Sequence, residues 1–159
     1  MIYLTCDVHQ PTLNNLEADY FSEDSLSLAE KYFSICNQAN VKTTFFYTGQ
    51  AAWAHRDWLK KTIKSHPGQI EIGGHTWNAL KYSKTWKFLL SKTKTKYNFL
   101  LLQLIDIWLT KFTIQLVSRC VMASWRTHAY NSSDTTYKLL NYLSVKVISD
   151  QKIEMGTPY

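Results

Sequence analysis

The sequence predicts an α/β fold built on a parallel sheet. Strand-like and helix-like segments alternate along its 159 residues, and polar residues directly follow several of the strand-like segments. With 45% hydrophobic and 14% aromatic residues, the chain can bury one sizeable core, so a single domain spanning residues 1–159 is expected. Right-handed crossovers join the strands in such folds, and functional side chains gather at the strands' carboxyl ends.

The first half of the chain contains three strand-like segments separated by helical ones. Residues 4–9 form the first, and residues 41–48, which are β-branched and aromatic, form the second. Between them a helix is expected to begin near Ser22, whose hydroxyl can cap it. Its residues at helical spacing should form a buried stripe of Leu26, Ala29, Phe33 and Cys36. A helix from Ala51 to Ser65 then leads to the third strand, at residues 70–72.

The second half continues the alternation. A helix at residues 98–116, a strand at residues 124–126, a helix capped by Ser133 and a strand at residues 145–149 are expected in that order. The longest apolar run, residues 99–109, is about half of the ~20 residues that a membrane-spanning helix needs. We interpret it as part of a buried helix, and no membrane span is expected.

The positive charge of the chain is concentrated in one segment. The formal net charge is +6, and residues 80–122 contain eight Lys or Arg against one Asp. Lysines and aromatics alternate between Lys81 and Lys96, as they do in surfaces that bind nucleic acid or anionic partners. A solvated loop and helix face is the simpler interpretation, because no nucleic-acid-binding motif accompanies the charge. No nucleic-acid partner is therefore expected.

Cysteine usage and the amino terminus favour a cytoplasmic location. Cys6, Cys36 and Cys120 show no spacing typical of a metal site or a disulfide framework, and their odd number argues against a stapled secreted domain. The chain begins with a strand-like run and shows no basic segment followed by a cleavable apolar region.

Polar residues that can carry chemistry follow three of the predicted strands. Asp7 and His9 end the first strand, His75 follows two glycines after the third, and Arg126 and His128 end the fourth. Because the carboxyl ends of parallel strands lie at one edge of the sheet, these side chains should converge. Solvated rim positions for Asp7 and His9, and a turn position for His75, are the simpler alternatives.

Five segments, in order along the chain, resemble the motifs of the polysaccharide deacetylase (NodB-homology) superfamily. They are Leu4–His9, Val41–Gly49, Glu71–Trp77, Ser124–Tyr130 and Val145–Asp150, and together they span roughly residues 1–150. The resemblance implies a distorted (β/α) barrel that removes acyl groups from N-acetylated sugars with a divalent metal, commonly zinc. The implied partner is an acetylated carbohydrate.

The resemblance also implies roles for single residues. Asp7 matches the general base, Arg126 the arginine that orients this base, and His75 the first metal histidine. His9 falls on an acidic metal ligand of one branch of the family, and Asp150 is matched with a strand-end acid. These groups suit the chemistry, because a metal lowers the pKa of water to ~7, a carboxylate can accept the proton and imidazoles are good zinc ligands.

The sequence departs from the family pattern at two places. Ala79 stands where the family has its second metal histidine, so His128 is expected either to supply a third imidazole or to act as the acid for the leaving amine. The family's closing motif, which carries a histidine general acid, has no counterpart in this chain. The expected fold is therefore an incomplete, truncated barrel, whose open edge an oligomer would cover.

Three aromatic residues near the expected site are assigned to substrate binding, namely Trp77, Trp125 and Tyr130. Burial in the core is the common alternative for such side chains. The leading hypothesis is a metal-dependent deacetylase-type hydrolase. The alternatives are a catalytically inactive remnant that binds saccharide or metal, and a basic surface module that uses Lys81 to Lys96.

Overall fold

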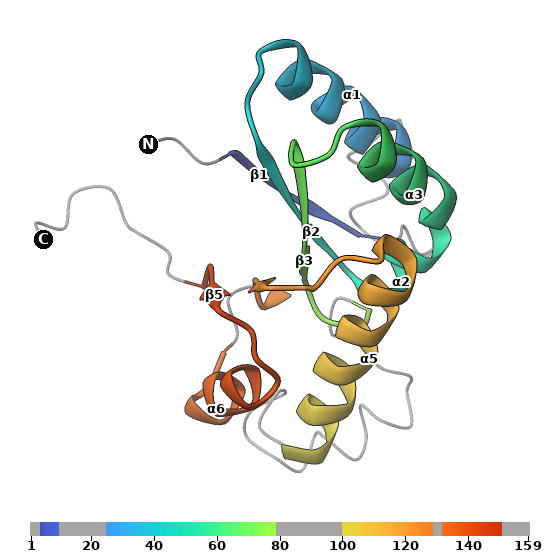
Figure 1. Cartoon of the computed structure of the whole chain (residues 1–159). Coiled ribbons are helices and arrows are strands. Elements are labelled where there is room, and N and C mark those ends of the chain that lie inside the picture. The colour runs from blue at the N-terminus through green and yellow to red at the C-terminus, as the bar shows by residue number, and fades with distance from the viewer. Residues whose placement is uncertain (1–3, 10–24, 79–99, 129–131, 151–159) are drawn as a thin grey trace, which may run out of the picture.

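Five parallel strands form one sheet in the order β1-β2-β3-β4-β5 (Figure 1). In this computed structural model, the described residues are 4–9, 25–78, 100–128 and 132–150. The strands are β1 (Leu4–Val8), β2 (Thr43–Tyr47), β3 (Ile70–Gly74), β4 (Ser124–Trp125) and β5 (Val147–Ile148). All four neighbouring pairs are parallel, so the carboxyl ends of all five strands lie at one edge.

The strand order identifies the type of α/β sheet. Strands follow one another in space as they do in sequence, with no reversal of direction across the sheet. In doubly wound sheets the order reverses at a switch point, whereas in (β/α) barrels it does not. The described sheet is thus an open α/β sheet wound in the barrel manner, as the sequence predicted for an incomplete barrel.

The helices α1, α2, α3 and α5 lie together on one side of the sheet (Figure 1). The described helices are α1 (Ser25–Gln38), α2 (Gly49–Ala54), α3 (Arg56–Ser65), α5 (Leu100–Ser118) and α6 (Asp134–Tyr142). The predicted cap of α6 is confirmed, because the Ser133 hydroxyl accepts from the Thr136 backbone N–H within a capping box. The predicted cap Ser22 lies outside the described residues, as does the basic stretch from Lys81 to Lys96.

One helix was predicted where the structure has two. The segment expected to run from Ala51 to Ser65 is divided at His55 into α2 and α3. His55 is buried, and its Nδ1 lies 3.4 Å from the Tyr47 hydroxyl. The Tyr47 hydroxyl gives this buried imidazole the polar partner that a buried polar group needs.

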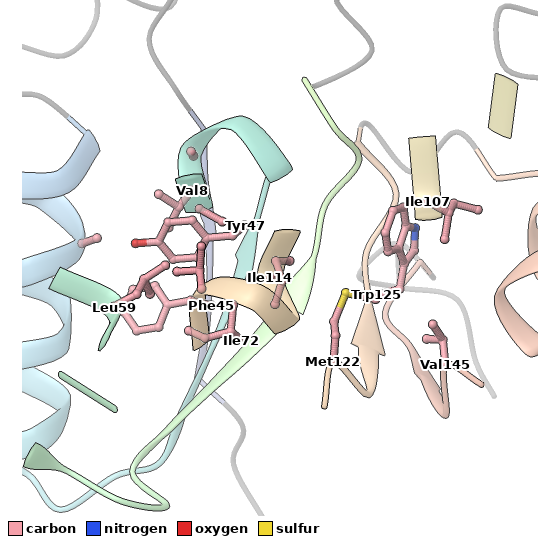
Figure 2. Packing of buried hydrophobic residues seen from close by; sticks show 14 of the residues in the cluster. Val8, Phe45, Tyr47, Leu59, Ile72, Ile107, Ile114, Met122, Trp125 and Val145 are labelled. Atoms are coloured by element: carbon pink, nitrogen blue, oxygen red, sulfur yellow. The ribbon is translucent and has the colours of Figure 1, made fainter. Parts of the chain in front are cut away.

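The two faces of the sheet have different roles. Phe45, Tyr47 and Ile72 point toward the helices and form the core with Trp125 (Figure 2). Side chains alternate between the faces of a strand, so Phe46, Gly73 and the neighbours of Trp125 in sequence face the opposite side. A Cβ on Gly73 would lie 2.6 Å from Ser124 Oγ and 2.7 Å from Phe46, which places these residues together on that inner face.

Helix α5 was expected to be buried, and the structure buries one face of it. Its buried residues include the polar Gln103, Asp106, Thr110 and Thr113, whereas every exposed residue is apolar. By length and composition alone, α5 could cross a membrane, since an 18-residue window has a mean hydropathy of 1.5. The same test is passed by core helices of soluble proteins, so it does not decide the matter.

Candidate metal centre

Three imidazoles meet at the carboxyl edge of the sheet. His9 follows β1, His75 follows β3 and His128 follows β4. Their ring centroids lie 4.8 Å apart for His9 and His75, 5.0 Å for His9 and His128, and 5.3 Å for His75 and His128. One nitrogen from each ring falls within 4.8 Å of the other two. The convergence expected from three strand ends is present.

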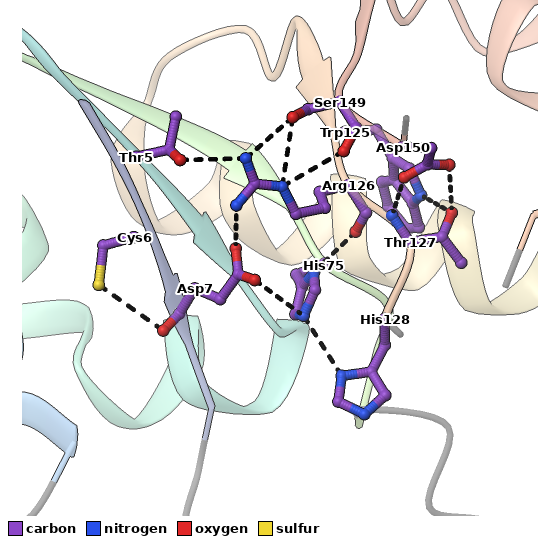
Figure 3. Close-up of polar contacts among 10 residues, drawn as sticks. All are labelled: Thr5, Cys6, Asp7, His75, Trp125, Arg126, Thr127, His128, Ser149 and Asp150. Carbon is purple, nitrogen blue, oxygen red and sulfur yellow. Dashed lines mark hydrogen bonds and ion pairs between the residues drawn. The ribbon is translucent and has the colours of Figure 1, made fainter. Parts of the chain in front are cut away.

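His75 has a defined tautomer. Its Nδ1 lies 2.7 Å from the backbone carbonyl of Arg126, and a carbonyl can only accept, so Nδ1 carries the proton and the neutral ring keeps a lone pair on Nε2 (Figure 3). Burial lowers the pKa of His75 to about 4, helped by His9 and His128 and opposed by Asp7 and the carbonyl bond. At neutral pH, His75 is therefore an uncharged ligand.

The spacing of two of the imidazole nitrogens fits a tetrahedral metal. His75 Nε2 lies 3.3 Å from His128 Nδ1. Two nitrogens that each lie ~2.0–2.1 Å from zinc in tetrahedral geometry are separated by about 3.3–3.4 Å. Metal-binding histidines also commonly donate their second N–H to a backbone carbonyl, as His75 does to Arg126. The residues present thus suit a divalent ion of the zinc type.

A carboxylate lies beside the three imidazoles. Asp7 Oδ1 accepts from Arg126 Nη1 at 2.8 Å, and Asp7 Oδ2 lies 3.9 Å from His75 Nε2 (Figure 3). The Asp7 side chain is 32% exposed to solvent, so water can reach it. The Arg126 guanidinium donates a hydrogen bond to Oδ1 of Asp7, and Oδ2 faces the imidazoles.

The Arg126 guanidinium is fixed by hydrogen bonds and by contact with an aromatic ring. Its Nη2 donates to Thr5 Oγ1 at 3.0 Å and to Ser149 Oγ at 2.9 Å, and its Nε lies 3.3 Å from the Ser149 carbonyl. Its guanidinium carbon lies 4.3 Å from the ring centre of Phe46. Thr5 and Asp7 alternate onto the same face of β1. Strands β1, β2 and β5 therefore fix the guanidinium that fixes Asp7.

Asp150 secures the segment that carries His128. Its Oδ1 accepts from the Thr127 backbone N–H at 2.6 Å, and its Oδ2 accepts from Thr127 Oγ1 at 3.0 Å and from the Ser132 hydroxyl. These bonds bracket His128 on both sides in sequence. Asp150, matched to a strand-end acid from the sequence, thus anchors the loop after β4.

Five of the eight residues assigned from the sequence come together here: Asp7, His9, His75, Arg126 and His128. Of the two alternatives for His128, its position favours the third imidazole. Tyr130 and Ala79 lie outside the described residues. Trp77 is half-buried, and its ring lies against Gly49, so its substrate-binding role stays a prediction.

The assignment of Trp125 to substrate binding is corrected by the structure. Its side chain is fully buried in the core, and its indole N–H donates to Thr127 Oγ1 at 3.0 Å. No face of this ring is available for stacking on a sugar. The sequence reasoning also missed Thr5 and Ser149. Thr5 could have been found from its position two residues before Asp7, on the same face of the strand.

No protein-family model and no curated protein sequence matches this chain. Solved structures do match its fold. A CE4 family pseudoenzyme from Bacillus anthracis has a TM-score of 0.62 at 13% identity, covering 92% of this chain and 42% of its own. A family 4 acetyl xylan esterase from Clostridium thermocellum, in complex with a cobalt ion, has a TM-score of 0.56 at 18% identity, covering 91% and 56%.

A peptidoglycan N-acetylglucosamine deacetylase has a TM-score of 0.60 at 17% identity, covering 92% of this chain and 54% of its own. The chain thus spans about half the length of these three structures. Its fold is that of the family 4 carbohydrate esterases and polysaccharide deacetylases. The resemblance to the polysaccharide deacetylase (NodB-homology) superfamily predicted from the sequence is therefore confirmed at the level of fold.

Proposed function

We propose that this chain is a metal-dependent hydrolase that cleaves carbon–nitrogen amide bonds of N-acetylated sugars. The observation that carries the proposal is the meeting of three imidazoles with the Asp7–Arg126 pair at one edge of the sheet. The deacetylase and esterase among the structures of like fold support the reaction class and a carbohydrate substrate.

His9, His75 and His128 would hold the metal, and zinc is the proposed ion because imidazole nitrogens suit it. A divalent ion at this place supplies Lewis acidity, which polarises an acyl carbonyl and makes water more acidic. His75 contributes its Nε2 lone pair without first losing a proton, since its proton resides on Nδ1. The Arg126 carbonyl keeps the ring in this orientation.

Asp7 would act as the general base. Arg126 binds Oδ1, and the remaining oxygen Oδ2 faces His75 Nε2 at 3.9 Å, where it can accept the proton of an attacking water. Arg126 holds the carboxylate in this orientation through its own bonds to Thr5 and Ser149. A base in a fixed position lowers the entropic cost of the proton transfer.

Zinc titration by calorimetry tests the metal site. Zinc should bind the wild-type chain with one site, and His75→Ala and His128→Ala should each weaken binding by at least about tenfold. His66→Ala is the matched control, because this half-buried histidine lies outside the three-histidine cluster. Equal zinc affinity in all four proteins would refute the metal site.

Acetate release from acetylated chito-oligosaccharides tests the reaction. The zinc-loaded chain should release acetate, and Asp7→Asn should abolish release while zinc binding persists, since the amide keeps the shape of the carboxylate but is a poor base. Release that is unaffected by Asp7→Asn would remove Asp7 from the mechanism.

A catalytically inactive binding protein is the second candidate function. Two observations favour it: a structure of like fold is a pseudoenzyme, and the described residues hold no separate histidine placed to act as an acid beyond the three of the cluster. Zinc and saccharide binding without acetate release would establish this alternative over the enzyme.

A further inference from the structure

The outer face of α5 is an apolar feature that the proposed site does not use. Five large side chains recur every three or four residues, and each is exposed by 44% to 55%: Leu101, Ile105, Trp108, Phe112 and Leu116. This spacing places them on one side of the helix. Trp108 and Phe112 stack on each other with ring centroids 5.4 Å apart. We refer to these five residues as the apolar stripe.

Helix α5 is apolar on its exposed face as well as on the face that enters the core, where Ile107 and Ile114 are buried. Its polar residues face the protein, where Asp106 Oδ1 accepts from the Trp77 backbone N–H at 3.0 Å and Gln103 Oε1 accepts from Thr136 Oγ1 at 2.8 Å. Its exposed positions are all apolar. Apolar stripes of this length mark surfaces that bind another apolar phase.

The charge that precedes α5 in the sequence indicates which apolar phase the stripe contacts. Residues 80–122 carry eight Lys or Arg against one Asp, and six of these lysines precede the helix within residues 81–96. An aromatic and aliphatic helix face combined with neighbouring lysines is the pattern of helices that lie in the interface of anionic bilayers.

We propose that the apolar stripe of α5 is a peripheral docking surface for an anionic lipid bilayer. The helix lies along the membrane surface, with the stripe inserted at the headgroup level and its polar face still bonded to the protein through Asp106 and Gln103. The lysines contribute attraction to anionic headgroups, so binding requires anionic lipid and weakens as salt rises. This inference is independent of the proposed hydrolase, because no residue of the stripe touches the three-histidine cluster.

Co-sedimentation with vesicles tests the docking surface. Wild-type chain should bind phosphatidylcholine vesicles that contain phosphatidylserine, and bind vesicles of phosphatidylcholine alone at least about fivefold less. Ile105→Glu should reduce binding to the anionic vesicles by about tenfold or more, since it places a charge in the stripe. Ile35→Glu is the matched control, because Ile35 is an exposed isoleucine on α1, 67% accessible, and the change in charge is identical.

Three results would overturn the proposal. One is the absence of wild-type binding to anionic vesicles, and another is an equal loss in the two glutamate variants. The third is a concentration-dependent dimer, seen by sedimentation equilibrium and abolished by Ile105→Glu, that does not bind vesicles; it would assign the stripe to a second copy of this chain.

A conservative variant keeps the test valid if a glutamate variant does not fold. Trp108→Phe retains an apolar ring in the stripe and removes one indole. With vesicles that carry brominated lipid tails, the quenched fraction of tryptophan fluorescence should be clearly smaller in Trp108→Phe than in wild type. Equal quenching in the two proteins would show that Trp108 does not enter the bilayer and would overturn the proposal.

Discussion

His75 binds its proton more weakly in the folded chain than in the unfolded one. An unfolded histidine titrates near pH 6.5, whereas burial lowers the pKa of His75 to about 4. Between these values the unfolded chain holds the extra proton, so the free energy of unfolding decreases as the pH falls from 6.5 to 4. Above pH 6.5 the group contributes no pH dependence.

We expect metal-free wild-type chain to lose about 3 kcal/mol of stability from His75 across this window. His75→Gln has no titrating group at this position, so its stability should depend less on pH between 6.5 and 4. Urea unfolding at a series of pH values, with a chelator present, measures both proteins. Parallel curves for the two would show that His75 is not the group responsible.

Arg126 is expected to act on the base and not on the metal. Its guanidinium binds Asp7, Thr5 and Ser149, while its backbone carbonyl orients His75. Arg126→Lys keeps the carbonyl and the charge but loses the planar fork that reaches several partners at once. Acetate release should fall by about a hundredfold with zinc affinity nearly unchanged. A parallel loss of zinc affinity would mean that Arg126 acts by holding the loop.

At the scale of the elements, Gly74 sets how closely the end of β3 packs against core side chains. A Cβ on Gly74 would lie 2.4 Å from Trp125 Cε3 and 2.8 Å from Met122 Sδ. Both neighbours are fully buried and cannot withdraw. The end of β3, from which His75 extends, can pack this closely only because residue 74 is a glycine and has no side chain.

Gly74→Ala should destabilise the chain by about 1–3 kcal/mol and weaken zinc binding, because overpacking displaces the strand end that carries His75. Gly68→Ala provides the contrast: the residue has free space around it but a φ of +78°, so only backbone strain of about 1–2 kcal/mol is expected. It lies away from the cluster and should leave zinc affinity unchanged. Thermal unfolding measures the stability of both variants, and calorimetry measures their zinc affinity.

The order of the elements could be predicted from the sequence because apolar, β-branched runs and helical periodicity are local signals. The burial of His55 could not, since its partner Tyr47 lies on another element. The burial of Trp125 was missed because β4 has two residues, too few for a visible alternation. Alternation from Arg126, which must face the site, would have placed Trp125 toward the helices.

The convergence of the candidate site was predictable from the sequence, whereas the residues that support it were not. Asp7, His9, His75, Arg126 and His128 each lie at or just after the end of a recognisable strand, and parallel strands bring their ends together. Ser149 and Ser132 act through contacts across 18 to 23 residues of sequence, which no local pattern encodes. The distance of 3.3 Å between His128 and His75 likewise has no local signal in the sequence.

For the whole molecule, the three-histidine cluster joins segments that are far apart in the chain. His9, His75 and His128 follow the first, third and fourth strands of the sheet. The unfolded chain cannot bring these three nitrogens together, so a metal should bind the folded state preferentially and stabilise it. The cluster thus couples metal binding to the arrangement of the sheet.

Zinc at one hundred times its dissociation constant should raise the free energy of unfolding by about 2.7 kcal/mol. For a domain of this size, that corresponds to an increase in Tm of roughly 5–10 °C. His128→Ala should lose most of the increase, because it removes the ligand from the fourth strand, whereas His66→Ala should retain it. Differential scanning calorimetry with and without zinc measures the shift. An equal shift in His128→Ala and wild type would mean that zinc binds elsewhere and that the three strand ends do not share an ion.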